Sequence, residues 1–451
     1  MGTTQEFAQF VVGTVFEDVP AHVVSYSKEL FLDAVGCALA GSVSPTGSAV
    51  VKFIRETGGT PECTVIGAGF RTSAPSAALA NGTLCHSMDY DDMNFNGHPS
   101  APIVPVLLAL GEKLGRTGRE IMEAHAVAFE VYGKIAGASK ELYDRGWHPT
   151  AIFGAMGAVA AGARILKLDV DATMNAFGIA ASETGGVRSA SGTMTKPLHA
   201  GHAARAGVVA AMLAAGGFTG RTDTLENPRG FSHAFIGPGN YDLQEMTGNL
   251  GKPFRMEYAA PSIKKYPCCG NNQRAIDAIF RLLEEHSISY DEVESVLVEV
   301  DARVGASLIF AEPKTGHEGR FSLQYNMAAA LLDGRIELGT YTDEKAASPK
   351  MKEAESKVTV KVHPDWDTSS KGRRHPVTVQ LKNGQHYTYV VDKLRGSPDL
   401  PLTRDELLAK YTDCARRVLS DRQIEKSAEL ILSLDELQDI RELMAILIGR
   451  G

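Results

Sequence analysis

Apolar residues recur at intervals of three and four along most of the first 260 residues, the spacing of one face of an α-helix. Segments with this spacing include VSYSKELFLDAVGCALAG, REIMEAHAVAFEVYGKIA and VDATMNAFGIAASETGG. Strand-like alternation is nearly absent there. Several helical segments, such as AIFGAMGAVAAGARIL, are rich in Ala and Gly. A Gly inside a helix costs roughly 1 kcal/mol against Ala, so we expect close helix packing to compensate.

Alternating apolar and polar residues, the pattern of half-buried strands, begin only after Pro267. The alternating segments are residues 293–302, 356–364 and 376–392, with helical spacing between them at residues 273–286 and 322–333. In the last alternating segment, Asn383-Gly384 predicts a type I′ hairpin turn. From Pro401 onward the spacing is helical again.

These patterns predict a fold that is mainly α with an α+β insert. At 451 residues the chain exceeds one ordinary core, so we expect two domains. The first is a large helical domain built from both chain ends, residues 1–262 and 397–451. The second is a smaller α+β domain formed by residues 263–396.

Composition favours a soluble globular protein and argues against several classes of partner. Hydrophobic residues make up 44% of the chain and charged residues 22%, and no apolar run approaches the roughly 20 residues of a bilayer span, so no membrane partner is expected. The net charge of −8 argues against binding to nucleic acid, which depends on clustered Lys and Arg. The first residues, MGTTQEFAQFVVG, do not resemble a secretory signal, so we expect a cytoplasmic location.

The richest run of ionisable residues, NGTLCHSMDYDDMNFNGH, spans residues 81–98. If residues 80–93 are helical, His86, Asp89 and Met93 share one face, which would bring an acid and an imidazole together. The two other carboxylates of the run would point elsewhere, so we predict no metal site. The six cysteines form no CxxC pair and have no His partner at zinc spacing. Because nucleotide-binding motifs such as GxxxxGK[ST] are absent too, we predict no cofactor.

Two further candidates precede helical segments built from small residues. His148 lies in GWHPT, where the start of a helix presents unpaired amides that suit a carboxylate. Lys196 is the only cation in a long run of small residues after Arg188. By itself His148 could be an ordinary loop residue and Lys196 a solvated surface charge. His199 and His202 follow Lys196 on the same segment, and we expect structural or supporting roles for them.

Six separated segments of the chain resemble the MmgE/PrpD family. The first is the run of residues 81–98 with the apolar helix that follows it, and the others are GWHPTAIFGAMGAVAAGARILKL, GTMTKPLHAGHAARAGVVAAMLAAGGFTG, KKYPCCGNNQRAIDAI, GRFSLQYNMAAALLDG and LPLTRDELLAKY. The family includes 2-methylcitrate dehydratases, cis-aconitate decarboxylases and iminodisuccinate epimerase. The resemblance implies that the C-terminal helices return to the first domain, that the α+β insert covers it as a lid, and that the protein is a homodimer.

The resemblance also implies roles for individual residues. Those that match active-site positions of the family are Asp89, His98, His148, Lys196 and Lys264. Some relatives carry a histidine at the position of Cys269 or of Gln273, so we expect Cys269 to act as an acid or base beside Lys264, with simple packing as the alternative. Met93 stands where decarboxylase relatives have a hydroxyl residue. The residues expected to bind substrate are Met93, Arg188, Tyr325 and Cys268.

The chemistry that the resemblance implies is proton abstraction next to a carboxylate of a small di- or tricarboxylic acid. Cations and donors must hold the charge that develops, and Lys196, Lys264 and His148 would supply them. Asp89 or His98 would be the base. We expect a 2-methylcitrate dehydratase-like reaction first, and the alternatives are an epimerase of the iminodisuccinate type or a cis-aconitate decarboxylase. An alternative of another class is a non-catalytic carboxylate-binding homologue, which the departures from the family pattern suggest.

Overall fold

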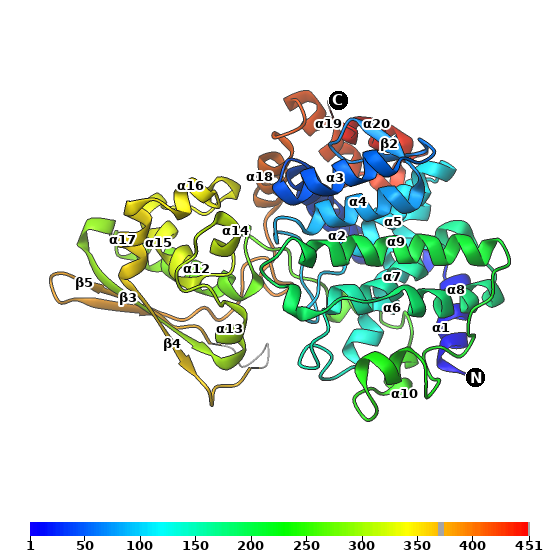
Figure 1. Cartoon of the computed structure of the whole chain (residues 1–451), viewed down its shortest axis with the longest axis horizontal. Coiled ribbons are helices and arrows are strands. Elements are labelled where there is room, and N and C mark those ends of the chain that lie inside the picture. The colour runs from blue at the N-terminus through cyan, green and yellow to red at the C-terminus, as the bar shows by residue number, and fades with distance from the viewer. Residues whose placement is uncertain (369–373, 450–451) are drawn as a thin grey trace. The chain divides into compact units, whose positions relative to one another are not determined.

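The computed structural model (Figure 1) describes residues 1–368 and 374–449. The chain forms two compact units: Met1–Ile263 together with Thr403–Gly451, and Lys264–Leu402. The sequence predicted residues 1–262 and 397–451 for the first unit. Helix accounts for 58% of the structure and strand for 9%, which confirms the predicted fold class.

The first unit is built almost entirely from helices. In chain order they are α1 (Thr3–Gly13), α2 (Ala21–Ser42), α3 (Pro45–Thr57), α4 (Ala74–His86), α5 (Ser100–Leu114), α6 (Gly118–Gly137), α7 (Pro149–Leu166), α8 (Val170–Glu183), α9 (Thr195–Ala215), α10 (Leu243–Thr247), α11 (Arg255–Tyr258), α18 (Arg404–Ala415), α19 (Asp421–Leu432) and α20 (Arg441–Leu447). The long helix α9 packs against both α4 and α7 (Figure 1). The residues of the candidate site come from the ends of these three helices and the loops beside them.

Small residues allow these helices to approach closely. A Cβ atom added to Gly201 of α9 would lie 2.2 Å from the carbonyl oxygen of Leu79 and 2.2 Å from Oγ1 of Thr83, both on α4. A Cβ atom added to Gly207 would lie 2.6 Å from the backbone carbonyl carbon of Ala158 on α7. No side chain fits at such distances, so the close packing expected from the small residues is confirmed.

The expectation of helix after helix in the first 260 residues is wrong at one place. Strands β1 (Cys63–Val65) and β2 (Phe70–Thr72) form an antiparallel hairpin between α3 and α4. The turn between them contains Gly67 with φ 71° and Gly69 with φ 73°, a left-handed backbone that glycine adopts without strain.

Helix α7 has the length and composition of a membrane span, with a mean hydropathy of 1.4 over 18 residues. The expectation that no apolar segment approaches such a span is therefore too strong. However, 89% of that window is buried within the protein, where α7 contacts α5, α6, α8 and α9. Packing on all these sides accounts for its apolar composition.

The second unit is an α+β structure around a mixed sheet of four strands. The strands are β3 (Val293–Asp301), β4 (Val358–His363), β5 (Val377–Leu381) and β6 (His386–Tyr389), in the order β4-β3-β5-β6, and only the β3–β4 pair is parallel. The helices are α12 (Gln273–Glu285), α13 (Ala302–Ser307), α14 (Gly316–Gly319), α15 (Leu323–Asp333), α16 (Asp343–Ala346) and α17 (Pro349–Ser356). Helix α12 packs on β5 and β6, and α15 packs on β4 (Figure 1).

The predicted β5–β6 hairpin is present, but its turn is not of type I′. Type I′ requires a positive φ at both central residues, whereas only Gly384 has one, at 88°. The register, which pairs Gln380 with His386, leaves three residues between Leu381 and Gln385. A three-residue loop with glycine in the left-handed region explains the Asn-Gly signal equally well.

Candidate active site

The run of residues 81–98 is a helix only in its first part. Helix α4 ends at His86, and Asp89 has a φ of 50°, which a helix cannot contain. Aspartate tolerates this left-handed conformation better than most residues. The predicted helix through Met93 is therefore wrong, and the chain turns back over the end of α4.

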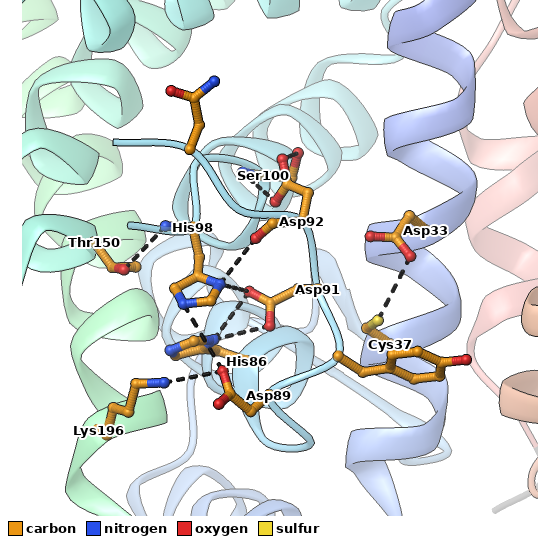
Figure 2. Close-up of polar contacts among 12 residues, drawn as sticks. Asp33, Cys37, His86, Asp89, Asp91, Asp92, His98, Ser100, Thr150 and Lys196 are labelled. Atoms are coloured by element: carbon orange, nitrogen blue, oxygen red, sulfur yellow. Dashed lines mark hydrogen bonds and ion pairs between the residues drawn. The ribbon is translucent and has the colours of Figure 1, made fainter. Parts of the chain in front are cut away.

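This reversal gathers the imidazoles and carboxylates into one buried cluster (Figure 2). Nδ1 of His86 lies 2.9 Å from each carboxylate oxygen of Asp91. Nδ1 of His98 lies 3.4 Å from Oδ2 of Asp91, and its Nε2 lies 3.8 Å from Oδ1 of Asp89. The rings of His86 and His98 are 4.3 Å apart between centroids. Asp91, which was expected to point away, is thus central to the cluster.

A backbone contact fixes the tautomer of His98 when its ring is neutral. Its Nδ1 lies 2.8 Å from the carbonyl oxygen of Asp92, which can only accept a hydrogen bond. Nδ1 therefore carries the hydrogen, and Nε2 is left with the lone pair. The backbone N–H of His98 also donates to Oγ1 of Thr150 at 3.1 Å, so the first turn of α7 holds this residue in place.

Asp92 fastens the loop to the start of α5. Its carboxylate accepts hydrogen bonds from Oγ of Ser100 at 2.9 Å and from the Ser100 amide at 3.2 Å (Figure 2). Burial raises the pKa of Asp92 well above its usual range, with further contributions from the nearby Asp33 and Asp91, against which the hydrogen bonds from Ser100 act. Its contacts make it a structural residue of the site.

The C-terminal part of the chain holds the same loop from the other side. Lys410 of α18 is buried, forms an ion pair with Asp33 of α2, and donates to the carbonyl oxygen of Tyr90 at 2.8 Å. Burial is the largest single influence on the pKa of Lys410 and lowers it, but the Asp33 carboxylate together with Cys37 and Cys414 outweighs burial and raises the pKa, which keeps the ammonium charged. Helix α18 therefore helps to shape the site.

Lys196 meets the cluster from the first turn of α9. Its Nζ lies 3.0 Å from Oδ1 of Asp89, and the two side chains are only 12% and 7% exposed (Figure 2). An ion pair this dry places a positive charge at a defined position. Asp89, a candidate base, is thus the partner of the Lys196 ammonium, and its role as a base remains a prediction.

His148 is the N-cap residue of α7 and is also buried in the cluster. Its ring stacks on that of His86 at a centroid distance of 5.8 Å. Burial lowers the pKa of His148 well below its usual value, and the positive charge of Lys196 adds to this shift. The residue is therefore a neutral donor or base at neutral pH, so that of the predicted cations and donors it would be a donor.

Arg188 and Met93 make contacts that sequence reasoning did not anticipate. The guanidinium of Arg188 lies 3.8 Å from the ring centroid of Tyr143, and its backbone N–H donates to the carbonyl of Gly146. Met93 pairs by two 2.9 Å backbone hydrogen bonds with Ser262. These contacts tie the loops of the site to neighbouring segments, and substrate contact by either side chain remains a prediction.

The other predicted site residues belong to the second unit. Tyr325 is fully buried, and its hydroxyl donates to the carbonyl oxygen of Thr340 at 2.5 Å. Cys268 is fully buried in the same hydrophobic core. Both residues are thus buried within the second unit, and substrate contact by either side chain remains a prediction. Lys264 is 1% exposed and Cys269 is partly buried, and their catalytic roles stay predictions.

Gln273, which stands where many relatives have a histidine, has a clear structural role. Its side chain accepts from the N–H of Tyr266 at 3.1 Å and donates to the carbonyl of the same residue at 2.9 Å. It therefore holds the KYPCC segment against the start of α12.

Four residues of the cluster could also hold a metal ion. One ligand atom from each of His86, Asp89, Asp91 and His98 lies within 4.8 Å of the others. Two imidazoles and two carboxylates suit a divalent cation such as Zn²⁺ or Mn²⁺. The argument that the carboxylates cannot converge is thus wrong, although the ammonium of Lys196 competes for Asp89.

The sequence did not predict the contact that His199 makes with the cluster. Its Nδ1 lies 3.1 Å from Nδ1 of His148, across 51 residues of sequence. The i+3 spacing from Lys196 placed both on one part of α9, but nothing in the spacing pointed to His148. The place of Asp91 could have been found by noting that the aspartates and Gly97-His98-Pro99 favour a loop over a continued helix.

Comparison with known proteins gives matches along nearly the whole chain. Residues 5–244 match the MmgE/PrpD N-terminal domain and residues 266–436 match the MmgE/PrpD C-terminal domain. The chain is similar to cis-aconitate decarboxylase of Homo sapiens, with 28% identity over 459 residues that cover 99% of this chain and 94% of that protein. It is 27% identical to the cis-aconitate decarboxylases of Mus musculus and of Aspergillus terreus strain NIH 2624, over 99% of this chain and 93% and 96% of those proteins.

Proposed function

Because the chain belongs to the MmgE/PrpD family, we propose that it removes CO₂ from a small tricarboxylic acid of the cis-aconitate type. It is an enzyme of lyase type, like the decarboxylases that it matches over 93% to 96% of their length. The observation that carries the proposal is the buried Lys196–Asp89 pair beside two imidazoles, those of His98 and His148.

Lys196 supplies the charge that such a substrate needs. An aconitate carries up to three negative charges, and the chain as a whole has a net charge of −8, so attraction must come from local groups. The ammonium of Lys196 is held 3.0 Å from Asp89 among buried side chains, where water screens it little. A substrate carboxylate that shares this ammonium would be fixed in position against the imidazoles.

The reaction requires stabilisation of an electron pair and delivery of one proton. When the C–CO₂ bond breaks, its electron pair stays on carbon and spreads toward a conjugated carboxylate. A fixed ammonium next to that carboxylate favours the charged transition state. Written with anions, cis-aconitate with three negative charges and one proton gives a C₅ product with two negative charges and CO₂.

An imidazole is suited to deliver that proton. His148 is neutral in the dry cluster, and a neutral imidazole carries one N–H. That proton can pass to carbon while another proton reaches the second ring nitrogen, which leaves the ring neutral. His98 is the second candidate once its Nε2 has taken up a proton, since this nitrogen lies 3.8 Å from Oδ1 of Asp89 beside Lys196.

Dehydration of 2-methylcitrate was the reaction expected first from the sequence, and it is now the alternative to decarboxylation. Loss of water would need one imidazole to take a proton from carbon and another to protonate the departing hydroxyl. The cluster contains enough imidazoles for both tasks, but the similarity to cis-aconitate decarboxylases over nearly their whole length favours decarboxylation.

Proton NMR of the purified protein with cis-aconitate, citrate, 2-methylcitrate and iminodisuccinate tests the proposal. We expect loss of cis-aconitate and growth of a C₅ product with terminal vinylidene signals. Conversion of 2-methylcitrate alone would replace decarboxylation by dehydration, and conversion of none of the four would overturn the substrate class. Lys196→Met should abolish conversion, while Lys52→Met, at a lysine whose side chain is 76% exposed on α3, should not.

A further inference from the structure

A pocket of about 750 Å³ lies on the first unit beside the catalytic cluster. Its lining includes residues of α3, α4 and α9 and the loop after α8. His199, His202 and Arg205 provide its ionisable groups, and apolar residues provide most of the rest. None of the residues assigned above to bind or transform substrate lines this pocket, so the proposed function leaves it unexplained.

His199 connects this pocket with the cluster. It lines the pocket, and its Nδ1 lies 3.1 Å from Nδ1 of the buried His148. The backbone of Gly186 keeps the two rings together, since its carbonyl accepts from the His148 amide at 3.0 Å, and a Cβ atom on Gly186 would lie 3.1 Å from Nδ1 of His199. The pair is therefore a built contact in which neither ring can move freely.

The contact allows only one hydrogen between the two rings. A hydrogen bond between two nitrogens needs one donor and one acceptor, so the pair must hold opposite roles at Nδ1. Burial lowers the pKa of His199 to about 4, with His86, His202 and Lys196 adding to the shift, and it lowers that of His148 as well. Both rings are thus neutral at neutral pH, and the tautomer of one dictates that of the other.

We propose that His199 is a positioning residue that sets the tautomer of His148 and passes protons to it from water in the pocket. The inference rests on the proposed decarboxylation, which consumes one proton for each CO₂ released. His148 carries its hydrogen on Nε2 at the start, and His199 donates from Nδ1. The side chains of His202 and Arg205 line the same pocket, and Arg205 forms an ion pair with Glu183.

The proton then moves in three linked transfers. The Nε2–H of His148 goes to the substrate carbon, the Nδ1–H of His199 goes to Nδ1 of His148, and Nε2 of His199 takes a proton from hydronium in the pocket. One proton has entered from solvent and one has reached carbon, and each ring remains neutral. After the product leaves, water admitted to the cluster exchanges protons with His148, and the pair returns to its starting tautomers.

The test compares His199→Ala with His202→Ala, a matched change at a pocket residue without a contact to His148. We expect His199→Ala to lower kcat by about 10²-fold with little change in KM, since general acid catalysis is worth about 10²- to 10⁴-fold. Added imidazole should restore turnover at constant pH, because it can enter the space left in the pocket. The wild type and His202→Ala should not respond to imidazole. Wild-type turnover in His199→Ala, or a loss that imidazole leaves unchanged, would overturn the relay.

A second readout needs no substrate. With ¹⁵N-labelled histidine, the ring nitrogens of His148 should shift in His199→Ala and stay unchanged in His202→Ala, because only the first variant removes the N–H···N bond. Unchanged His148 signals in both variants would contradict the contact itself. If the wild type fails to convert cis-aconitate while the ¹⁵N signals behave as expected, the proposed decarboxylation is wrong, but the hydrogen bond between His148 and His199 is confirmed.

Discussion

Replacing Lys196 by methionine should affect two properties, the stability of the fold and the binding of the anionic substrate. The ammonium lies 3.0 Å from Oδ1 of Asp89, and the side chains are 12% and 7% exposed. Methionine keeps most of the length of the lysine stem but leaves the Asp89 carboxylate in a buried position without its cation. Removing one partner of a buried pair costs roughly 3 kcal/mol, and removing one oriented charge from an active site costs about 10²- to 10³-fold in rate.

The double variant Asp89→Asn/Lys196→Met distinguishes these effects. An amide tolerates the buried position better than an unpaired carboxylate, so the free energy of unfolding should recover most of the loss seen in Lys196→Met. Turnover should not recover, because no cation is left for the substrate. Urea unfolding and the NMR conversion assay measure the two quantities on the same samples. A double variant as active as the wild type would refute the assignment of Lys196 as the anion anchor, and full stability in Lys196→Met would refute the buried ion pair.

The remaining predictions concern packing, pH, metal and the partly buried thiol of Cys269. Gly201→Ala should lower the midpoint of thermal unfolding strongly, because its Cβ would meet backbone at 2.2 Å, whereas Gly185→Ala, with nothing within 4 Å, should have a small effect. Burial lowers the pKa of His125 to about 3 from the ordinary 6.5, so the folded state binds fewer protons than the unfolded chain between these values. Stability should therefore fall as pH drops below 6.5, by at most about 1.4 kcal/mol per pH unit from this residue, and His125→Asn should flatten the slope in urea titrations. EDTA should leave turnover unchanged, and activity that EDTA removes and Zn²⁺ restores would contradict Lys196 as the partner of Asp89. Iodoacetamide should modify Cys269 first, since it is the one cysteine of the six that is not buried, and mass spectrometry of the native protein would show it.

The fold was largely readable from periodicity because both units bury their apolar residues on regular elements. The small residues of α7 and α9 predicted close helix contacts, and the structure confirms these contacts at Gly201 and Gly207. The hairpin of β1 and β2 escaped prediction because each strand has only three residues, too few for a visible alternation. The turn type at Gly384 also escaped, since Asn-Gly fits several loop lengths.

The site was readable only in part, because its geometry depends on contacts between distant segments. His148 and Lys196 stood out since each precedes a helix of small residues, and the structure places both beside the same cluster. The roles of Asp91 and His199 could not be read from spacing. The first depends on the left-handed Asp89 that ends the helical path, and the second on a contact between α9 and the start of α7.

The central claim is that the protein decarboxylates cis-aconitate. Its most direct test is an experiment in D₂O that measures the released CO₂ and the deuterium in the product. The protein is incubated with cis-aconitate, the released CO₂ is trapped and quantified, and the product is examined by mass spectrometry and NMR. Decarboxylation predicts one CO₂ for each product molecule and one deuterium bound to carbon, because the proton comes from a group that exchanges with solvent. A product that keeps all six carbons, or unchanged cis-aconitate under conditions where the protein is folded, would contradict the account.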